Sequence, residues 1–208
     1  MSPGAETWSS LSSLATETIR GEFAALRPLS VADAETTHQW RHAARAAYLN
    51  QSAATVEEQA RWIAGRPASE LNYIIELTSG EPVGMLSLIA IDLTHRRAES
   101  ARFLIGDEAL VKGAPVAVEA MKLLYAVGFD RLGLERIHGL IEVRNHLMLK
   151  WQLYLGMKEE GRLRRHYLRD DEFIDAVALG LLADEYRRVS LPKMNALIAL
   201  ARSRPAAN

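Results

Sequence analysis

The stretch from residue 71 to residue 130 constrains the fold most, because it sets the order of several elements at once. LNYIIELTSGEPVGMLSLIAIDL (71–93) has two apolar runs on either side of SGEPVG, a pattern typical of a β-hairpin. RRAESARFLIGD (96–107) predicts a third strand, and residues 116–130 place apolar side chains at helical spacing. Three strands and a helix joined by short turns predict a layered fold of sheet and helices.

The rest of the chain continues this pattern with recognisable starts and stops. Ser30 and Thr55 are placed to cap helices, and Gly156 is placed to end one. The further elements we expect are strand 21–30, helix 31–49, helix 55–66, strand 135–143, helix 145–156, two last strands in 157–168 and 171–186, and a short amphipathic helix in the tail. This order predicts an α+β (α/β layered) fold, in which a mixed sheet has helices on both faces.

Length and composition fit one domain with short flanking segments. The 208 residues divide into a flexible or peripheral segment (1–20), a domain (21–188) and a C-terminal helix and tail (189–208). A net charge of −1 gives no global basic field for nucleic acid, and no apolar stretch is long enough for a membrane span. The absence of cysteine excludes a thiol-enzyme mechanism. We expect a cytoplasmic protein with no nucleic-acid or membrane partner, and no histidine pattern suggests a metal.

The turn LVKGAPVAVEAM (110–121) is the first candidate for chemistry. A strand end leads into the N-terminus of a helix, where free backbone N–H groups and the helix dipole favour an anion. Pro115 lies inside this turn and has no N–H to donate. Residues 110–121 therefore form either a phosphate-binding turn with one donor missing or an ordinary corner between a strand and a helix.

The second half of the chain resembles the GNAT superfamily of N-acetyltransferases. In LGLERIHGLIEVRNHLMLKWQLYLGMKEEGRLR (132–164), a strand is followed by Asn145, a helix ending at LGM, and a Glu-rich strand, as in that family. IDLTHRRAESARFLIGD (91–107) and LRPLSVADAETTHQW (26–40) are similar to a subgroup that acetylates spermidine, ribosomal proteins and nucleotide-linked amino sugars. The likeness extends over roughly residues 22–188.

The resemblance implies a central sheet whose middle strands splay apart around coenzyme A. It places residues 112–117 on the family's pyrophosphate loop, Q/R-x-x-G-x-G/A, with Lys112 at the first position and Pro115 where glycine is usual. The coenzyme-binding residues that it implies are the backbone of Phe103, Leu104 and Ile105, the side chains of Lys112 and Asn145, and the N–H groups of Gly113, Ala114, Val116 and Ala117. The cosubstrate is acetyl-CoA, and a homodimer is expected from the resemblance alone.

Catalysis requires a proton acceptor for the amine and help for the leaving thiolate. An alkyl amine has a pKa of about 10.4, so a base must take its proton at neutral pH. Glu99 is our first candidate base and Glu142 our second, although either is equally consistent with an exposed strand carboxylate. The family often has a tyrosine as general acid seven residues after the asparagine, where this chain has Gln152. Tyr154, the substitute acid, lies about 200° around the helix and is also consistent with a packing residue.

The expected activity is acetyl transfer from acetyl-CoA to the primary amine of a small molecule. A nucleotide-linked amino sugar is the acceptor that we favour, because GRLRRHYLR (161–169) is basic; that run is also consistent with a solvated strand. A polyamine or a protein N-terminus is the alternative acceptor. The rival function is a catalytically impaired GNAT-like binding module, suggested by Pro115 and Gln152. Trp40 and Trp62 are expected in the core, and the alternative is that they line the acceptor pocket.

Overall fold

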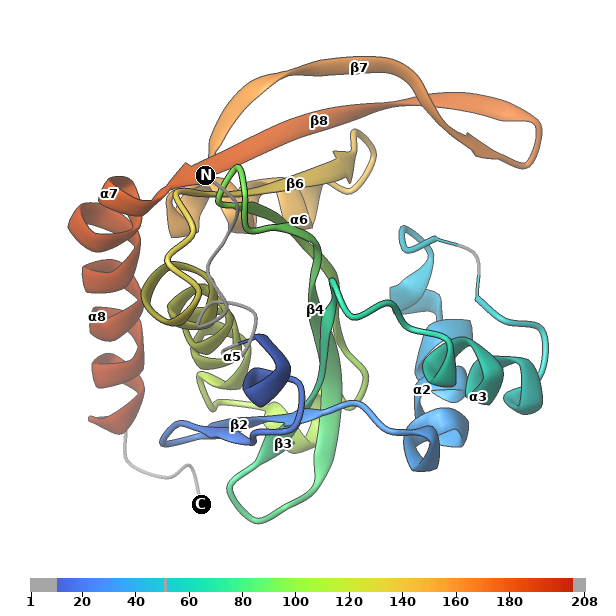
Figure 1. Ribbon diagram of the computed structural model, residues 1–208, viewed down its shortest axis with the longest axis horizontal. Coiled ribbons are helices and arrows are strands. Elements are labelled where there is room, and N and C mark those ends of the chain that lie inside the picture. Colours follow the sequence, from blue (N-terminus) through green and yellow to red (C-terminus); the bar gives the residue numbers. More distant parts are fainter. Residues whose placement is uncertain (1–10, 51, 204–208) are drawn as a thin grey trace.

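A computed structural model describes residues 11–50 and 52–203 and contains one eight-stranded sheet (Figure 1). In spatial order the strands are β1 (Ile19–Arg20), β2 (Ala24–Pro28), β3 (Leu71–Leu77), β4 (Pro82–Asp92), β5 (Arg97–Ile105), β6 (Arg136–Glu142), β8 (Glu172–Leu182) and β7 (Lys158–Arg169). Neighbouring strands run antiparallel except β5 and β6, which are parallel. The mixed sheet with helices on both faces is confirmed.

Helices cover the two faces of this sheet. The longer ones are α2 (Ala34–His42), α3 (Val56–Ala64), α5 (Val116–Ala126), α6 (His146–Leu155) and α8 (Leu191–Arg202), and the shorter turns are η1 (Val31–Asp33), η2 (Ala44–Ala46), α4 (Glu108–Val111), η3 (Val127–Arg131), α7 (Ala183–Glu185) and η4 (Tyr186–Ser190). Figure 1 shows α5 and α8 on one side of β4, and α2 and α3 on the other. None of the described helices is both long and apolar enough to cross a bilayer.

Local signals in the sequence place several of these elements correctly. The β3–β4 hairpin turns at Gly80, whose φ of +102° suits glycine, and Leu77 and Glu81 pair across the turn. Thr55 caps α3 by accepting a hydrogen bond from the Glu58 N–H at 3.2 Å. Gly156 ends α6 with a φ of +115°. Because each of these signals depends on only a few neighbouring residues, it can be recognised in the sequence.

The helix expected over residues 31–49 is wrong in its second half. After η1, α2 ends at His42, and Ala43 is extended with ψ 154° before η2 begins. Trp40 and Ala46 both pack in a small apolar cluster with Leu104. In a continuous helix these two positions would lie about 120° apart and face different ways. Breaking the helix at Ala43 lets both side chains reach the same cluster.

The main core lies between the sheet and the α5 side of the molecule. It includes Leu14 and Met194, both fully buried, so segments on either side of residues 21–188 contribute to it. The last residues of the expected tail, 204–208, lie outside the described residues, as do 1–10 of the expected N-terminal segment. Glu119 on α5 is 3% exposed, and its carboxylate accepts hydrogen bonds from the N–H groups of residues 22, 23 and 24 at 3.0, 2.5 and 2.8 Å. This carboxylate fastens the start of β2 to α5.

Candidate active site

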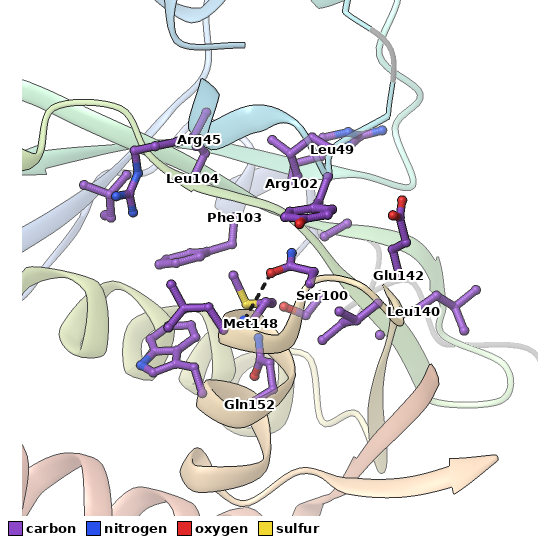
Figure 2. A pocket seen from close by; sticks show the side chains of 18 of the residues that line it. Arg45, Leu49, Ser100, Arg102, Phe103, Leu104, Leu140, Glu142, Met148 and Gln152 are labelled. Atoms are coloured by element: carbon purple, nitrogen blue, oxygen red, sulfur yellow. Dashed lines mark hydrogen bonds between the residues drawn. The ribbon is translucent and has the colours of Figure 1, made fainter. Parts of the chain in front are cut away.

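The two middle strands separate and leave a cavity between them. In the described part of the chain, β5 pairs with β6 only where Arg97–Glu99 lies beside Arg136–His138. From Ser100 onward, β5 is paired on its β4 side alone. A cavity of about 490 Å³ opens at this splay, lined by β5, β6, the start of α6 and the segment that follows α2 (Figure 2). The splay predicted between the central strands is therefore present.

A β-bulge shapes the β5 wall of the cavity. The β4–β5 register shifts between Met85 and Ser87, and Arg102 adopts a φ of +57°, which is uncommon for a residue other than glycine. Phe103 stacks on Trp151 of α6, with ring centroids 4.8 Å apart. The side chains of Leu104 and Ile105 are buried in the two cores, although both residues line the cavity. What they can offer a ligand is therefore mainly backbone.

The glycine turn has a different set of available donors from the one expected. The Ala114 N–H donates to the Val111 carbonyl at 3.0 Å, so our expectation that it is available to phosphate is corrected. Pro115 is the N-cap of α5, and the first helical bond runs from the Glu119 N–H to the Pro115 carbonyl at 2.9 Å. The N–H groups of residues 116, 117 and 118 precede that bond, and Gly113 has a φ of +82°. These three N–H groups have no partner within the helix, but Val116 is fully buried, so our expectation that its N–H is available is corrected and the donors open to a ligand are those of Ala117 and Val118.

Asn145 caps α6 at the rim of the cavity. Its Oδ1 accepts a hydrogen bond from the Met148 N–H at 3.2 Å, drawn as a dashed line in Figure 2. The amide Nδ2 has no hydrogen bond to another described residue in the structure. Since the oxygen is used by the cap, Nδ2 is the group that this side chain can offer to a ligand in the cavity.

On α6, Gln152 faces the cavity and Tyr154 does not. Gln152 is 6% exposed and lines the cavity, and its Oε1 accepts a hydrogen bond from the Tyr125 hydroxyl at 3.0 Å. Tyr154 is 53% exposed, and the Lys193 ammonium lies 4.6 Å from its ring centroid. The helix has not slipped in register, so Tyr154 is corrected to a surface residue. The Tyr125–Gln152 pair had no signal in the sequence, because its members are 27 residues apart.

Glu142 is held by two arginines. Its side chain is 1% exposed, with one oxygen 2.8 Å from Arg144 Nε and the other 2.7 Å from Arg169 Nε. Arg169 also donates to the carbonyls of Tyr48 and Leu49, at 3.0 Å each. Glu142 therefore fastens a wall of the cavity, and we correct its assignment as a candidate base.

Glu99 has the surroundings of a candidate base. It lies opposite His138 at the last β5–β6 pair before the splay. Its neighbour Ala98 packs in the main core, so alternation along the strand directs Glu99 to the α2–α3 face. Burial raises the pKa of the Glu99 carboxyl, while the nearby charges of Arg102 and His166 oppose the rise. A partly buried carboxylate with a raised pKa is suited to accept a proton near neutrality.

The tryptophans and the basic run divide between core and surface. Trp40 is 8% exposed and belongs to the small apolar cluster, whereas Trp62 of α3 lies among three arginines. Residues 158–166 of β7 are all exposed. Within the basic run, Arg162 lies 3.7 Å from Asp175, and Arg169 is the residue that holds Glu142. The run is mostly a solvated strand.

A strand pair that splays over a cavity, followed by a helix N-terminus, is the arrangement that the resemblance to GNAT acetyltransferases implies. A family model described as an acetyltransferase (GNAT) domain matches residues 24–158, which is more than half of the chain. The chain belongs to the GNAT acetyltransferase family.

Individual relatives agree with this family. The spermidine N(1)-acetyltransferase of Escherichia coli K12 is 28% identical over 118 residues, which are 57% of this chain and 61% of that protein. The crystal structure of a GCN5-related N-acetyltransferase from Brucella melitensis matches with a TM-score of 0.80, 21% identity, and coverage of 93% of this chain and 90% of that one. The spermidine N-acetyltransferase of Vibrio cholerae, solved in complex with CoA and spermine, matches with a TM-score of 0.71, 20% identity, and coverage of 81% and 100%. At these identities the two structures support the fold.

Proposed function

We propose that this protein transfers an acetyl group from acetyl-CoA to the primary amine of a small molecule. The observation that carries the proposal is the cavity at the splay of β5 and β6, because one side of β5 is left without a partner strand there. An extended pantetheine arm contains amides that can pair with such a strand. Family membership supports the same activity.

The residues around the cavity fit coenzyme A. The backbone of Phe103 to Ile105 would align the pantetheine, and the Asn145 amide would donate from the opposite side. The N–H groups of Ala117 and Val118 would bind the pyrophosphate at the positive end of the α5 dipole, with Lys112 adding charge. Loss of the N–H at Pro115 removes one donor and leaves these in place.

The chemistry follows from a base on one side of the thioester and a donor on the other. The amine nitrogen attacks the thioester carbon, the new C–N bond forms, and Glu99 takes the amine proton directly or through a water. The C–S bond then breaks, and its electron pair leaves on sulfur as the thiolate. A thiol pKa of about 8.5 makes this a fair leaving group without a general acid. The Gln152 amide is placed to donate a hydrogen bond to it.

The acceptor has three candidate classes. A nucleotide-linked amino sugar is the class we favour from the sequence, and the likeness to spermidine acetyltransferases supports a polyamine. A protein N-terminus is the third class. A GNAT-like module that binds without turnover is the rival function.

Calorimetric titration with acetyl-CoA, beside dephospho-CoA as the control, is the first test. Micromolar binding supports the coenzyme site, and thiol release with a panel of amines then tests turnover. Absence of binding at millimolar acetyl-CoA would overturn the coenzyme site. Binding without thiol release from any amine would favour the binding module.

A further inference from the structure

Three arginines from three different elements converge on one indole ring beside the cavity. The guanidinium carbons of Arg41, Arg66 and Arg102 lie 6.0, 4.1 and 5.2 Å from the centroid of Trp62. Arg41 comes from α2, Trp62 from α3 and Arg102 from the bulge of β5. We call these four residues the Trp62 cluster. Contacts of this kind hold guanidinium groups in fixed positions.

The positive charge of the Trp62 cluster is only partly balanced. Glu70 is the carboxylate that pairs with it, at 2.9 Å from Arg102 and 3.5 Å from Arg66. Arg102 also donates to Asn72, so its two terminal nitrogens are occupied. Three cations against Glu70 leave a net charge of about +2, and of about +1 when Glu99, which interacts with Arg102, is ionised, since arginine stays protonated in proteins.

Arg41 is the member with donors to spare. Its one hydrogen bond to a described residue runs from Nη2 to the Asn50 carbonyl, at 2.7 Å. It is half-buried, and burial together with the neighbouring Arg102 lowers the pKa of its guanidinium. An uncompensated, partly desolvated cation is stabilised when an anion reaches it, and a guanidinium matches carboxylate and phosphate oxygens in pairs.

The Trp62 cluster meets the cavity at Arg102, whereas Arg41, Trp62 and Arg66 lie behind it and do not line the cavity. Arg102 lines the cavity, as does Arg45 of η2, which follows the break at Ala43, and Figure 2 shows both above Phe103. Glu99, the candidate base, lies three residues before Arg102 and feels its charge. The predicted coenzyme groups on α5 and α6 lie on the other side of β5, so an anion at Arg41 is not the coenzyme pyrophosphate.

We propose that Arg41, held against Trp62 and beside Arg102, binds an oxyanion carried by the amine acceptor. The acceptor is then an amine bearing a carboxylate or a phosphate, as a nucleotide-linked amino sugar does, and not a polyamine, whose extra ammonium groups the net positive charge repels. This inference rests on the proposed function and adds the chemical class of the substrate.

Three amines that share an aminoethyl group test the class of acceptor. O-phosphoethanolamine, β-alanine and ethanolamine differ in carrying a phosphate, a carboxylate or a hydroxyl, and spermidine represents the polyamines. We expect kcat/KM for at least one of the two anionic amines to exceed that for ethanolamine by about tenfold or more, the usual weight of one charged hydrogen bond. The preferred one of these two amines shows whether the site binds a phosphate or a carboxylate. Equal or higher kcat/KM for spermidine would overturn the proposal.

Arg41→Gln should remove this preference through KM, with kcat for ethanolamine within about twofold of wild type. Arg61→Gln is the matched control, because Arg61 is also on the α2–α3 layer but is 76% exposed and pairs only loosely with Glu58. If Arg41→Gln lowered kcat/KM equally for all four acceptors, an oxyanion site would be contradicted. An effect confined to a higher KM for acetyl-CoA would contradict it too.

A binding experiment separates this proposal from the proposed function. With coenzyme A saturating, inorganic phosphate should change the tryptophan emission of wild type and of Arg61→Gln at constant ionic strength. The change should be lost in Arg41→Gln, and in Trp62→Phe if Trp62 is the reporter. An unchanged response in Arg41→Gln, or none in wild type, overturns the anion site. Failure of thiol release with every amine would instead overturn the transferase and leave this result standing.

Discussion

At the scale of single residues, Gln152 is the main departure from the family pattern. Its Oε1 is held by the buried Tyr125 hydroxyl, which leaves Nε2 to donate into the cavity. An amide in this place can stabilise a thiolate by a hydrogen bond but cannot protonate it. The protein would then release coenzyme A as the thiolate and rely on solvent for the proton.

Gln152→Ala should lower kcat about a hundredfold, the usual loss when one preorganised donor to a developing anion is removed, with little change in KM for acetyl-CoA. Since an amide does not titrate, wild type should show no alkaline fall in kcat, whereas Gln152→Tyr should acquire one near pH 10, at about the pKa of tyrosine. Steady-state rates of thiol release across pH check both. Tyr154→Phe is the control on the exposed face of α6, and a comparable loss there would contradict the assignment.

Glu99 should set the acidic limb of the pH profile. Burial raises the pKa of this carboxyl, and the ionised form is the base, so kcat/KM should rise with pH through a value above the ordinary 4.3. In Glu99→Gln, kcat/KM should fall about 10²-fold or more, and the acidic limb of the pH profile should flatten. The profile is measured with acceptor below its KM. Retention of the same limb in Glu99→Gln would show that another group is the base.

At the scale of elements, the α4–α5 turn combines a lost donor with an intact helix start. Pro115 is the N-cap of α5, a position whose own N–H makes no helical bond, so proline costs the helix little. The N–H groups of Ala117 and Val118 remain at the start of α5, whereas Val116 is buried and the Ala114 N–H is used within the turn. The turn therefore has fewer donors for an anion, although it still starts α5 normally.

Pro115→Ala should bind coenzyme A up to about tenfold more tightly, because it restores one N–H that can donate to a charged phosphate. Calorimetry with coenzyme A gives the dissociation constant directly. Pro82→Ala, at the exposed start of β4, is the matched control and should leave it unchanged. Weaker binding by Pro115→Ala would mean that the rigid φ of proline, and not the missing donor, governs the turn.

At the scale of the whole molecule, Glu142 joins parts of the chain that are far apart in sequence. Through Arg169 it connects β6 to the β7–β8 hairpin and to the carbonyls of residues 48 and 49, which form a wall of the cavity. The homodimer expected from the family resemblance stays a prediction, as does the division into a domain with two flanking segments.

Glu142→Gln should lower the free energy of unfolding by about 2–3 kcal/mol, somewhat less than for a fully buried pair because Arg169 is 21% exposed. KM for the acceptor should also rise as the wall loosens. Urea unfolding and steady-state kinetics measure the two effects. Glu172→Gln is the control, since Glu172 is 68% exposed where it pairs with Arg144, and it should leave both unchanged. A loss of kcat with unchanged stability would return Glu142 to the candidate bases.

Much of the fold could be predicted from the sequence alone. The β3–β4 hairpin, the cap at Thr55 and the end of α6 at Gly156 depend on residues a few positions apart, and the order of these elements with the resemblance at Asn145 was enough to indicate the family. Some of the residues that the sequence named, including Phe103 and Ala117, line the cavity.

Only the tertiary structure decided what those residues can do. It distinguished Glu99 from Glu142 by the arginines that reach one and not the other, used the Ala114 N–H within its own turn, and paired Gln152 with Tyr125. It also brought Arg41 and Arg102 to Trp62 from separate elements. The physical reason is range. Caps and turns are set by neighbours along the chain, whereas the charge and hydrogen bonding of a buried group are set by whatever the fold packs against it.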